Sequence, residues 1–136
     1  DEGSWMFPSS PVGGGKREEE AFIEHEVIHL SNGDVYDGQC VQVAGGVKQH
    51  GYGTYRYSGQ DTSYREYTGN WDHGKKHGHG VLFLQSGGAY VGQWYHNQKH
   101  GLGVMFDYAD DRNILGMPTY SYEGEWEQDQ KSGFGV

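Results

Sequence analysis

The sequence predicts an all-β protein, an elongated antiparallel sheet in which short hairpins stack on one another. Three observations support this fold class. A phrase of the form Tyr-x-Gly-x-Trp, followed by two paired glycines, recurs along the chain. Large and small residues within the phrase alternate with the period of two that is typical of strands. The chain is also 15% aromatic and has 24 glycines in 136 residues, which is well above the usual glycine share of about 7%.

The recurring phrase divides most of the chain into units. From the tyrosine to the first paired glycine there are 11 residues in three of the units, and the earliest unit is longer and has Cys40 in the tryptophan position. Residues 36–136 are therefore predicted to be a repeat array whose last unit is truncated. The units start near Tyr36, Tyr67, Tyr90 and Tyr122.

Residues 1–35 are predicted to be a degenerate first unit. They keep part of the hydrophobic pattern, but glutamates replace the paired glycines. Residues 8–20 are polar and glycine-rich, which is typical of a flexible insertion. A second insertion covers residues 110–119, and its apolar side chains either fold over the sheet or provide a second contact.

Each regular unit is predicted to contain two strands and a tight turn. Tyr67, Gly69 and Trp71 lie two apart and therefore point to one face of the sheet, as do the alternate residues of 80–84. The segments HGKK and HNQK between the strands contain Gly or Asn, as a tight hairpin requires. A ring that lies over a neighbouring strand needs a position without a Cβ atom, and glycine provides it. Because an isolated hairpin is not stable, the units are expected to depend on their neighbours.

Charge and cysteine content narrow the function classes. The chain has 19 acidic and 10 basic residues, a formal charge of −9, which argues against binding to nucleic acid or to anionic membrane lipid, because both need a cationic surface. Cys40 is the only cysteine, so the chain has neither a disulfide framework nor a zinc quartet, and a reducing cytosol or nucleus is expected.

On these motifs the sequence resembles the MORN (membrane occupation and recognition nexus) family. The segments YEGEWEQDQKSGFGV and YVGQWYHNQKHGLGV are close to the Tyr-Glu-Gly-Glu-Trp phrase and paired glycines of that repeat. The resemblance covers residues 36–136 well and residues 1–35 loosely. It implies a single-layer, curved β-solenoid that acts as a scaffold and partner-binding module and has no catalytic residues of its own. It also implies a tendency to dimerise.

The predicted partner-binding residues form one aromatic face of this sheet. Because a single-layer sheet has no second layer to cover that face, we expect an uncovered row that binds a helical or extended protein segment, with Trp71 and Trp94 as its main anchors. The alternative is that the rings only stack on one another and hold the solenoid together. The predicted residues are Tyr67, Trp71, Leu82, Leu84, Tyr90, Trp94, Met105, Tyr122 and Trp126.

No catalytic, cofactor or metal site is predicted. His50, His77 and His100 share the position before the first paired glycine. Two strands separate equivalent histidines, so they should lie roughly 10 Å apart, whereas a zinc ion needs ligands at about 2 Å. We therefore interpret these histidines as turn residues. Neither a nucleophile motif nor a paired-carboxylate arrangement is visible in the sequence.

The function predicted from the sequence is a non-catalytic protein-interaction scaffold, expected in a cytoskeletal or ciliary (axonemal) assembly of the cytoplasm. One alternative is a peripheral membrane module that recognises anionic phospholipid. Another is the regulatory arm of an enzyme whose catalytic part lies outside this chain. Stacked hairpins also leave an unpaired strand edge at each end of the solenoid, which predicts a homodimer.

Overall fold

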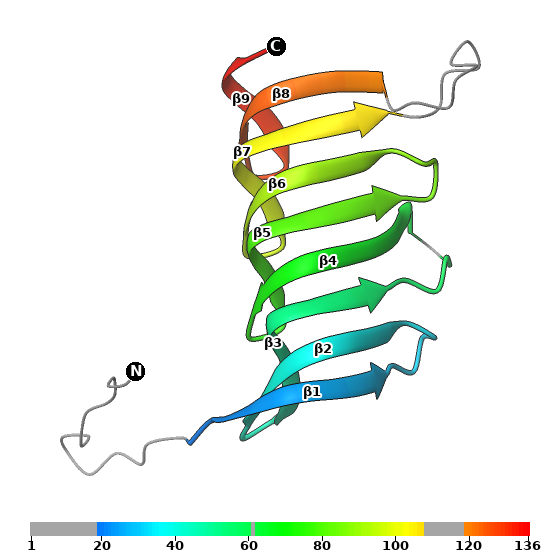
Figure 1. The fold of residues 1–136 in the computed structure, drawn as a ribbon, viewed down its shortest axis with the longest axis vertical. Coiled ribbons are helices and arrows are strands. Elements are labelled where there is room, and N and C mark those ends of the chain that lie inside the picture. The colour runs from blue at the N-terminus through cyan, green and yellow to red at the C-terminus, as the bar shows by residue number, and fades with distance from the viewer. Residues whose placement is uncertain (1–18, 61, 108–118) are drawn as a thin grey trace, which may run out of the picture.

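The chain folds into one open antiparallel sheet of nine strands, each hydrogen-bonded to its neighbours in sequence order. The computed structural model describes residues 19–60, 62–107 and 119–136 (Figure 1). The predicted all-β fold of stacked hairpins is confirmed. The strands are β1 (Ala21–His29), β2 (Val35–Val43), β3 (Gly46–Arg56), β4 (Tyr64–Asp72), β5 (Lys75–Leu84), β6 (Ala89–Tyr95), β7 (Gln98–Asp107), β8 (Thr119–Glu127) and β9 (Gln130–Gly135).

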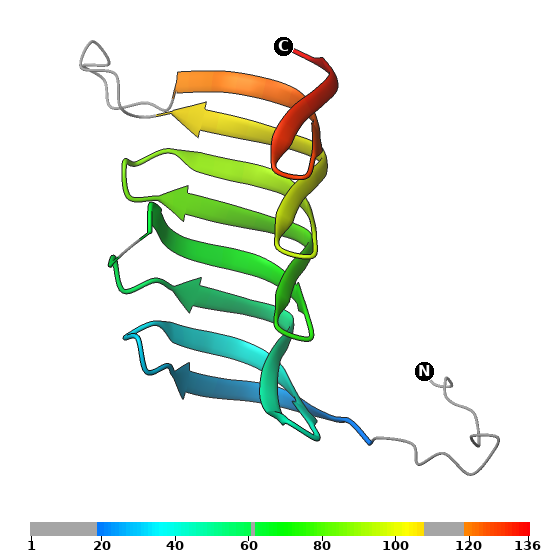
Figure 2. The same ribbon diagram turned by 180° about the vertical axis from the view of Figure 1, so that it is seen from behind.

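The strands lie side by side along the long axis of the molecule and form a single layer (Figure 1). The turns that join β4 to β5, β6 to β7 and β8 to β9 lie on one side, where the strands bend out of the plane of the sheet (Figure 2). The predicted insertion at 8–20 lies outside the described residues except for its last two, and the predicted insertion at 110–119 lies outside them except for Thr119.

Tight two-residue turns join the two strands of each regular unit. Both central residues of each turn have a positive φ, which is the geometry of a type I′ hairpin. This geometry matches the right-handed twist of the flanking strands, and the Gly and Asn noted in the sequence suit it. The turn residues and their φ angles are His73 (48°) and Gly74 (90°), His96 (48°) and Asn97 (73°), and Gln128 (51°) and Asp129 (68°).

A β-bulge interrupts each unit at the same place. In the β4–β5 pair the register shifts between Gly69 and Trp71, and the first paired glycine of that unit, Gly78, has a φ of 77°. A bulge bends its strand and increases its twist. The two paired glycines therefore have different structural roles. The sequence interpretation assigned both glycines to the space beneath a ring. The first glycine is instead needed because the backbone at its position has a positive φ.

The second paired glycine makes the predicted space for a ring. A Cβ atom on Gly80 would overlap the ring of Tyr67, and one on Gly69 would overlap the backbone of Gly80. The Tyr67 hydroxyl reaches across the bulge and donates a hydrogen bond to the carbonyl of Asn70 at 2.9 Å. The same contact recurs where Tyr36 covers Gly53, Tyr90 covers Gly103 and Tyr122 covers Gly135.

We predict that Gly80→Ala lowers the free energy of unfolding by about 2 kcal/mol or more, because the added methyl group displaces the Tyr67 ring from its position over residue 80. The melting temperature should fall by roughly 10 °C. Thermal unfolding followed by circular dichroism measures this. The matched control is Gly45→Ala, since a Cβ atom there meets nothing within 4 Å. Equal losses in the two variants would contradict the ring-over-glycine explanation.

Candidate functional site

Tyrosine and tryptophan rings alternate along one face of the sheet in an unbroken edge-to-face series. Neighbouring centroids lie 5.1–5.5 Å apart and the ring planes meet at 84–89°. Such a pair contributes about 0.5–1.5 kcal/mol beyond the area that it buries. We call this series the aromatic row, and its members in spatial order are Tyr36, Trp71, Tyr67, Trp94, Tyr90, Trp126 and Tyr122.

Each tryptophan of the aromatic row also bonds to the backbone of the preceding unit. The indole Nε1 donates to the carbonyl of the second paired glycine of that unit, which satisfies the one polar atom of a buried indole. A tryptophan thus links two units through both its ring and its N–H group. The three bonds run from Trp71 to Gly53, from Trp94 to Gly80 and from Trp126 to Gly103, each at 3.2 Å.

The structure brings the predicted partner-binding residues together on this face, but it buries most of them. Tyr67, Leu82 and Tyr90 are 0% exposed, and Trp94, Trp126 and Trp71 are 3%, 5% and 6% exposed. Leu84, Met105 and Tyr122 are half-buried against them. The expectation of an uncovered row is therefore wrong for the buried six. The rings cover one another, as the alternative interpretation of this face stated.

Lysine side chains add to the cover of the aromatic row. Lys76 is 7% exposed, and its Nζ lies 5.5–5.8 Å from the centroids of five rings, those of Tyr57, Tyr64, Tyr67, Trp71 and Trp94. The ring faces attract the ammonium group, while burial lowers the pKa of Lys76 to about 8. Lys99 lies over Tyr90 and Trp126 in the same way.

A polar hollow of about 520 Å³ opens beside Lys76, and Tyr57, Tyr64 and Asp34 also line it. The Asp34 carboxylate accepts hydrogen bonds from the Tyr55 hydroxyl and from a backbone N–H group, both at 2.7 Å. Burial opposes ionisation of Asp34, but these hydrogen bonds outweigh it and lower the pKa of the carboxyl group. The hydrogen bonds of this carboxylate thus stabilise the loop that follows β3.

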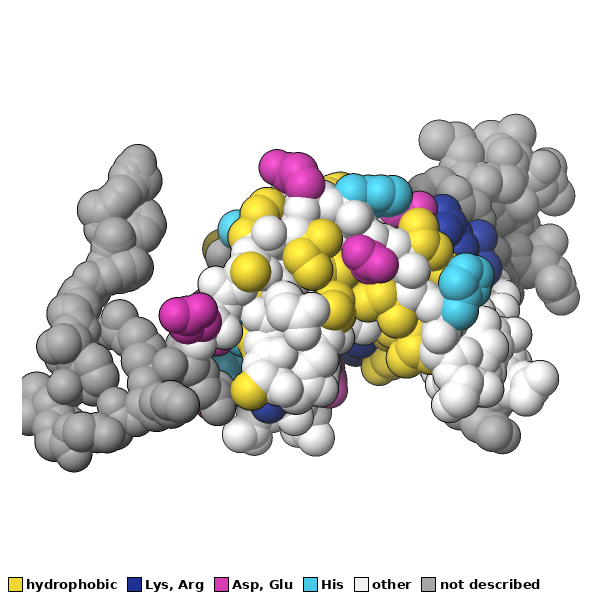
Figure 3. All heavy atoms as spheres, turned by 90° about the horizontal axis from the view of Figure 1, so that it is seen from below, with side chains coloured by type: hydrophobic (Ala, Val, Ile, Leu, Met, Phe, Trp, Pro, Cys, Tyr) yellow, Lys and Arg dark blue, Asp and Glu magenta, His cyan; other side chains and the backbone are white. Residues whose placement is uncertain are grey.

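The opposite face of the sheet exposes large apolar side chains. The residue between the paired glycines points away from the aromatic row, because successive side chains of a strand alternate between its faces. This position is occupied by Tyr52, Leu102 and Phe134, which are 57%, 63% and 87% exposed, and by His79. In the end-on view of Figure 3, hydrophobic side chains gather in the middle of the molecule and histidines lie toward its edges.

Glycines form the floor of two hollows on this opposite face. One hollow has a volume of about 310 Å³ and the other about 710 Å³, and Val91 lines both of them. The glycines that seat the tyrosine rings alternate with residues whose side chains point to this face, so the glycine backbone lies at the bottom of each hollow. We call the apolar residues around these hollows the apolar strip, which consists of Tyr52, Val81, Val91, Leu102, Val104, Phe134 and Val136.

The sequence interpretation missed the apolar strip. Its signal was present in the triplets GYG, GLG and GFG, where an apolar residue alternates with glycines that belong to the other face. The strip also has acidic neighbours. Glu123 lines the larger hollow, and Glu125 pairs with Leu102 in the sheet.

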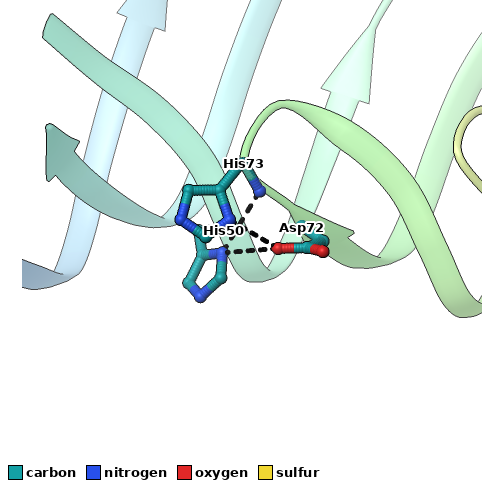
Figure 4. Close-up of side chains that lie close together, drawn as sticks. All are labelled: His50, Asp72 and His73. Carbon is teal, nitrogen blue, oxygen red and sulfur yellow. Dashed lines mark hydrogen bonds and ion pairs between the residues drawn. The ribbon is translucent and has the colours of Figure 1, made fainter. Parts of the chain in front are cut away.

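Two histidines and two carboxylates meet at the bend of β3 and β4, where Figure 4 shows His50, Asp72 and His73. The sequence interpretation compared His50 only with the histidines in the same position of other units. In the structure it contacts a turn residue of the next unit instead, and the ring centroids of His50 and His73 lie 4.6 Å apart. Hydrogen bonds to Asp72 and Glu20 raise the pKa of His73, whereas burial and the neighbouring His73 lower that of His50.

We predict that the stability of the protein relative to its Lys76→Met variant increases as the pH rises from 7 to about 10. The pKa of Lys76 is about 8 in the folded chain, below its usual value of 10.5, so the unfolded chain binds more protons between these values and folding becomes more favourable with rising pH. Urea unfolding at several pH values measures the difference between the two proteins. A difference that stays constant over this range would contradict the burial of a charged amine.

The sequence matches the MORN repeat in four stretches, residues 48–62, 67–89, 90–108 and 122–136, which together make up more than half of the chain. Comparison with curated proteins gives no significant match. In the part of the chain that the structure describes, no helix has the length and apolarity needed to cross a bilayer. MORN repeats are generally modules for interaction with proteins or membranes. Through its repeats and the nine-stranded sheet that they build, the chain belongs to the MORN-repeat family.

Proposed function

We propose that this chain is a non-catalytic protein-interaction scaffold that binds a partner segment along its apolar strip. The observation that carries the proposal is the exposure of Leu102 and Phe134, 63% and 87%, beside a hollow of about 710 Å³ that both residues line. Neighbouring exposed apolar side chains on one face are typical of an interaction site. Large side chains that fill such hollows commonly account for most of the binding energy.

The chemistry of the strip indicates the kind of partner. A segment that offers apolar side chains to the two hollows and carries Lys or Arg on either side would complement Glu125, which pairs with Leu102 in the sheet, and the formal charge of −9. Complementary charge increases the association rate and suppresses wrong partners. We therefore propose a basic amphipathic segment as the partner.

The hypothesis of a partner on the aromatic face is less well supported by the geometry. Of the nine predicted residues, six are buried, and Leu84, Met105 and Tyr122 are only partly buried. Replacing Trp94 with Ala would remove two ring contacts and the bond to Gly80. A loss of binding in that variant would therefore report unfolding, and the variant cannot test the site.

We further propose a cytoplasmic setting in a cytoskeletal or axonemal assembly, which is supported by the family and by the single cysteine. We also propose a homodimer, in which the edge of an outer strand of the described sheet pairs with a second copy of the chain, because exposed strand edges pair readily with other strands. A role as the regulatory arm of a larger enzyme is compatible with the same surfaces.

We predict that Leu102→Glu abolishes partner binding and leaves the fold intact, because it places a carboxylate in the hollow at an exposed position. A displayed library of random peptides is selected on the unmodified chain, and the enriched peptides are then measured against the variant by fluorescence anisotropy. Enriched peptides should be apolar and basic, and their affinity for the Leu102→Glu variant should fall at least tenfold.

The matched control for this experiment is Val47→Glu, which adds the same charge at an exposed apolar residue outside the strip (38% exposed). It should bind the selected peptides as the unmodified chain does. Circular dichroism of both variants confirms that the fold is kept. Selection of acidic peptides, or equal binding by the Leu102→Glu variant, would refute the proposed surface.

We predict no binding to vesicles that contain phosphatidylserine or phosphoinositides at physiological salt. Ten basic residues against 19 acidic ones leave the protein repelled by an anionic surface. Co-sedimentation with vesicles measures this, and neutral phosphatidylcholine vesicles are the control. Sedimentation with anionic vesicles that raised salt abolishes would favour the membrane alternative instead.

A further inference from the structure

We propose that His50, Asp72 and His73 form a binding site for a divalent transition-metal ion such as Zn²⁺. One ligand atom from each of the three residues can be chosen so that all three lie within 4.8 Å of one another. Imidazole nitrogens and carboxylate oxygens are ordinary zinc ligands at about 2.0–2.2 Å, which places two tetrahedral ligand atoms about 3.3 Å apart. Small side-chain rotations are therefore enough to enclose an ion.

Three elements hold the proposed ligands at one point. His50 lies on β3, Asp72 ends β4, and His73 begins the turn to β5. His50 Nδ1 is 3.6 Å from the Asp72 carboxylate, and the side chains of His50, Asp72 and His73 are 32%, 43% and 41% exposed, so an ion can reach them from solvent. Glu20 lies 3.1 Å from Nε2, the opposite nitrogen of the His73 ring, so it orients this ring while Nδ1 faces Asp72.

The hydrogen bonds of the cluster show where an ion would bind. His73 Nδ1 lies 2.6 Å from the Asp72 carboxylate, and His50 Nδ1 accepts a hydrogen bond from the backbone N–H of His73 at 3.2 Å. The electron pairs of an imidazole and a carboxylate thus converge on a shared proton. A divalent ion that replaces this proton would bind His73 and Asp72, and His50 would add a third ligand once its Nδ1 releases the His73 N–H group. A water molecule would then take the fourth position, as at an open zinc site.

The repeats of the chain provide internal comparisons for this cluster. The equivalent positions of the next unit hold His77, Tyr95 and His96, where a phenol replaces the carboxylate, and those of the last unit hold His100, Glu127 and Gln128. Of these three sets of equivalent positions, only that of His50, Asp72 and His73 combines two imidazoles with a carboxylate. The turn residue has nearly the same φ in all three units, 48° at His73, 48° at His96 and 51° at Gln128. Glutamine is therefore compatible with this turn, and His73→Gln should fold.

The site would link segments that are far apart in the sequence. His50 lies on β3, and His73 lies 23 residues later in the β4–β5 turn. A bound ion would fasten β3 to this turn and raise the melting temperature, because the folded state alone presents the ligands together. The site lies outside the apolar strip, so its test is independent of the proposed partner surface.

Isothermal titration of the whole chain, purified without a histidine tag, with ZnCl₂ tests this proposal. We expect one Zn²⁺ per chain, at least tenfold weaker binding by His73→Gln, and unchanged binding by His96→Gln, the matched control one unit away. Asp72→Tyr, which copies the next unit, should also lose binding. Circular dichroism of the zinc-free variants checks their folding. Absence of binding by the unmodified chain, or equal binding by all of these variants, would overturn the proposal.

Discussion

The contact of a tyrosine ring with a glycine on the neighbouring strand is the interaction on which the rest of this structure depends. The Tyr67 ring occupies the space that a Cβ atom of Gly80 would fill, and its hydroxyl bonds to the Asn70 carbonyl on the far side of the bulge. The ring therefore stabilises the bulge, and the bulge bends the strand. The bend turns Trp71 toward the preceding unit, where its indole N–H group reaches the Gly53 carbonyl.

This arrangement makes the units depend on one another, and it gives the two faces of the sheet different roles. Trp94 lies edge-on between Tyr67 and Tyr90, one from each of two units, so a single unit cannot bury its own rings. The rings of the aromatic row are therefore buried and stabilise the fold. The hollows of the apolar strip lie on the other face, between exposed side chains that alternate with the glycines along the strands. The two faces of one sheet thus provide stability and a surface for recognition.

Much of the fold could be predicted from the sequence, because strand alternation and turn composition are local properties. The burial of Trp71 and Trp94 could not, since alternation assigns a residue to a face but does not reveal how sharply the sheet bends around it. The positive φ of Gly78 could not be predicted either, because it also depends on how the strand bends. The contact between His50 and His73 depends on the register of β3 against β4, in which Gly51 pairs with Trp71, and no single unit contains that information.

Hydrogen exchange of the tryptophan indole N–H groups, followed by ¹⁵N nuclear magnetic resonance, tests the central claim most directly. Trp71, Trp94 and Trp126 each donate a buried hydrogen bond to a glycine carbonyl. Their indole protons should therefore exchange on the order of a hundredfold more slowly than those of free tryptophan, or slower still, because exchange requires that the units separate. Exchange of these three protons at the rate of free tryptophan would show an open aromatic face and would contradict the account.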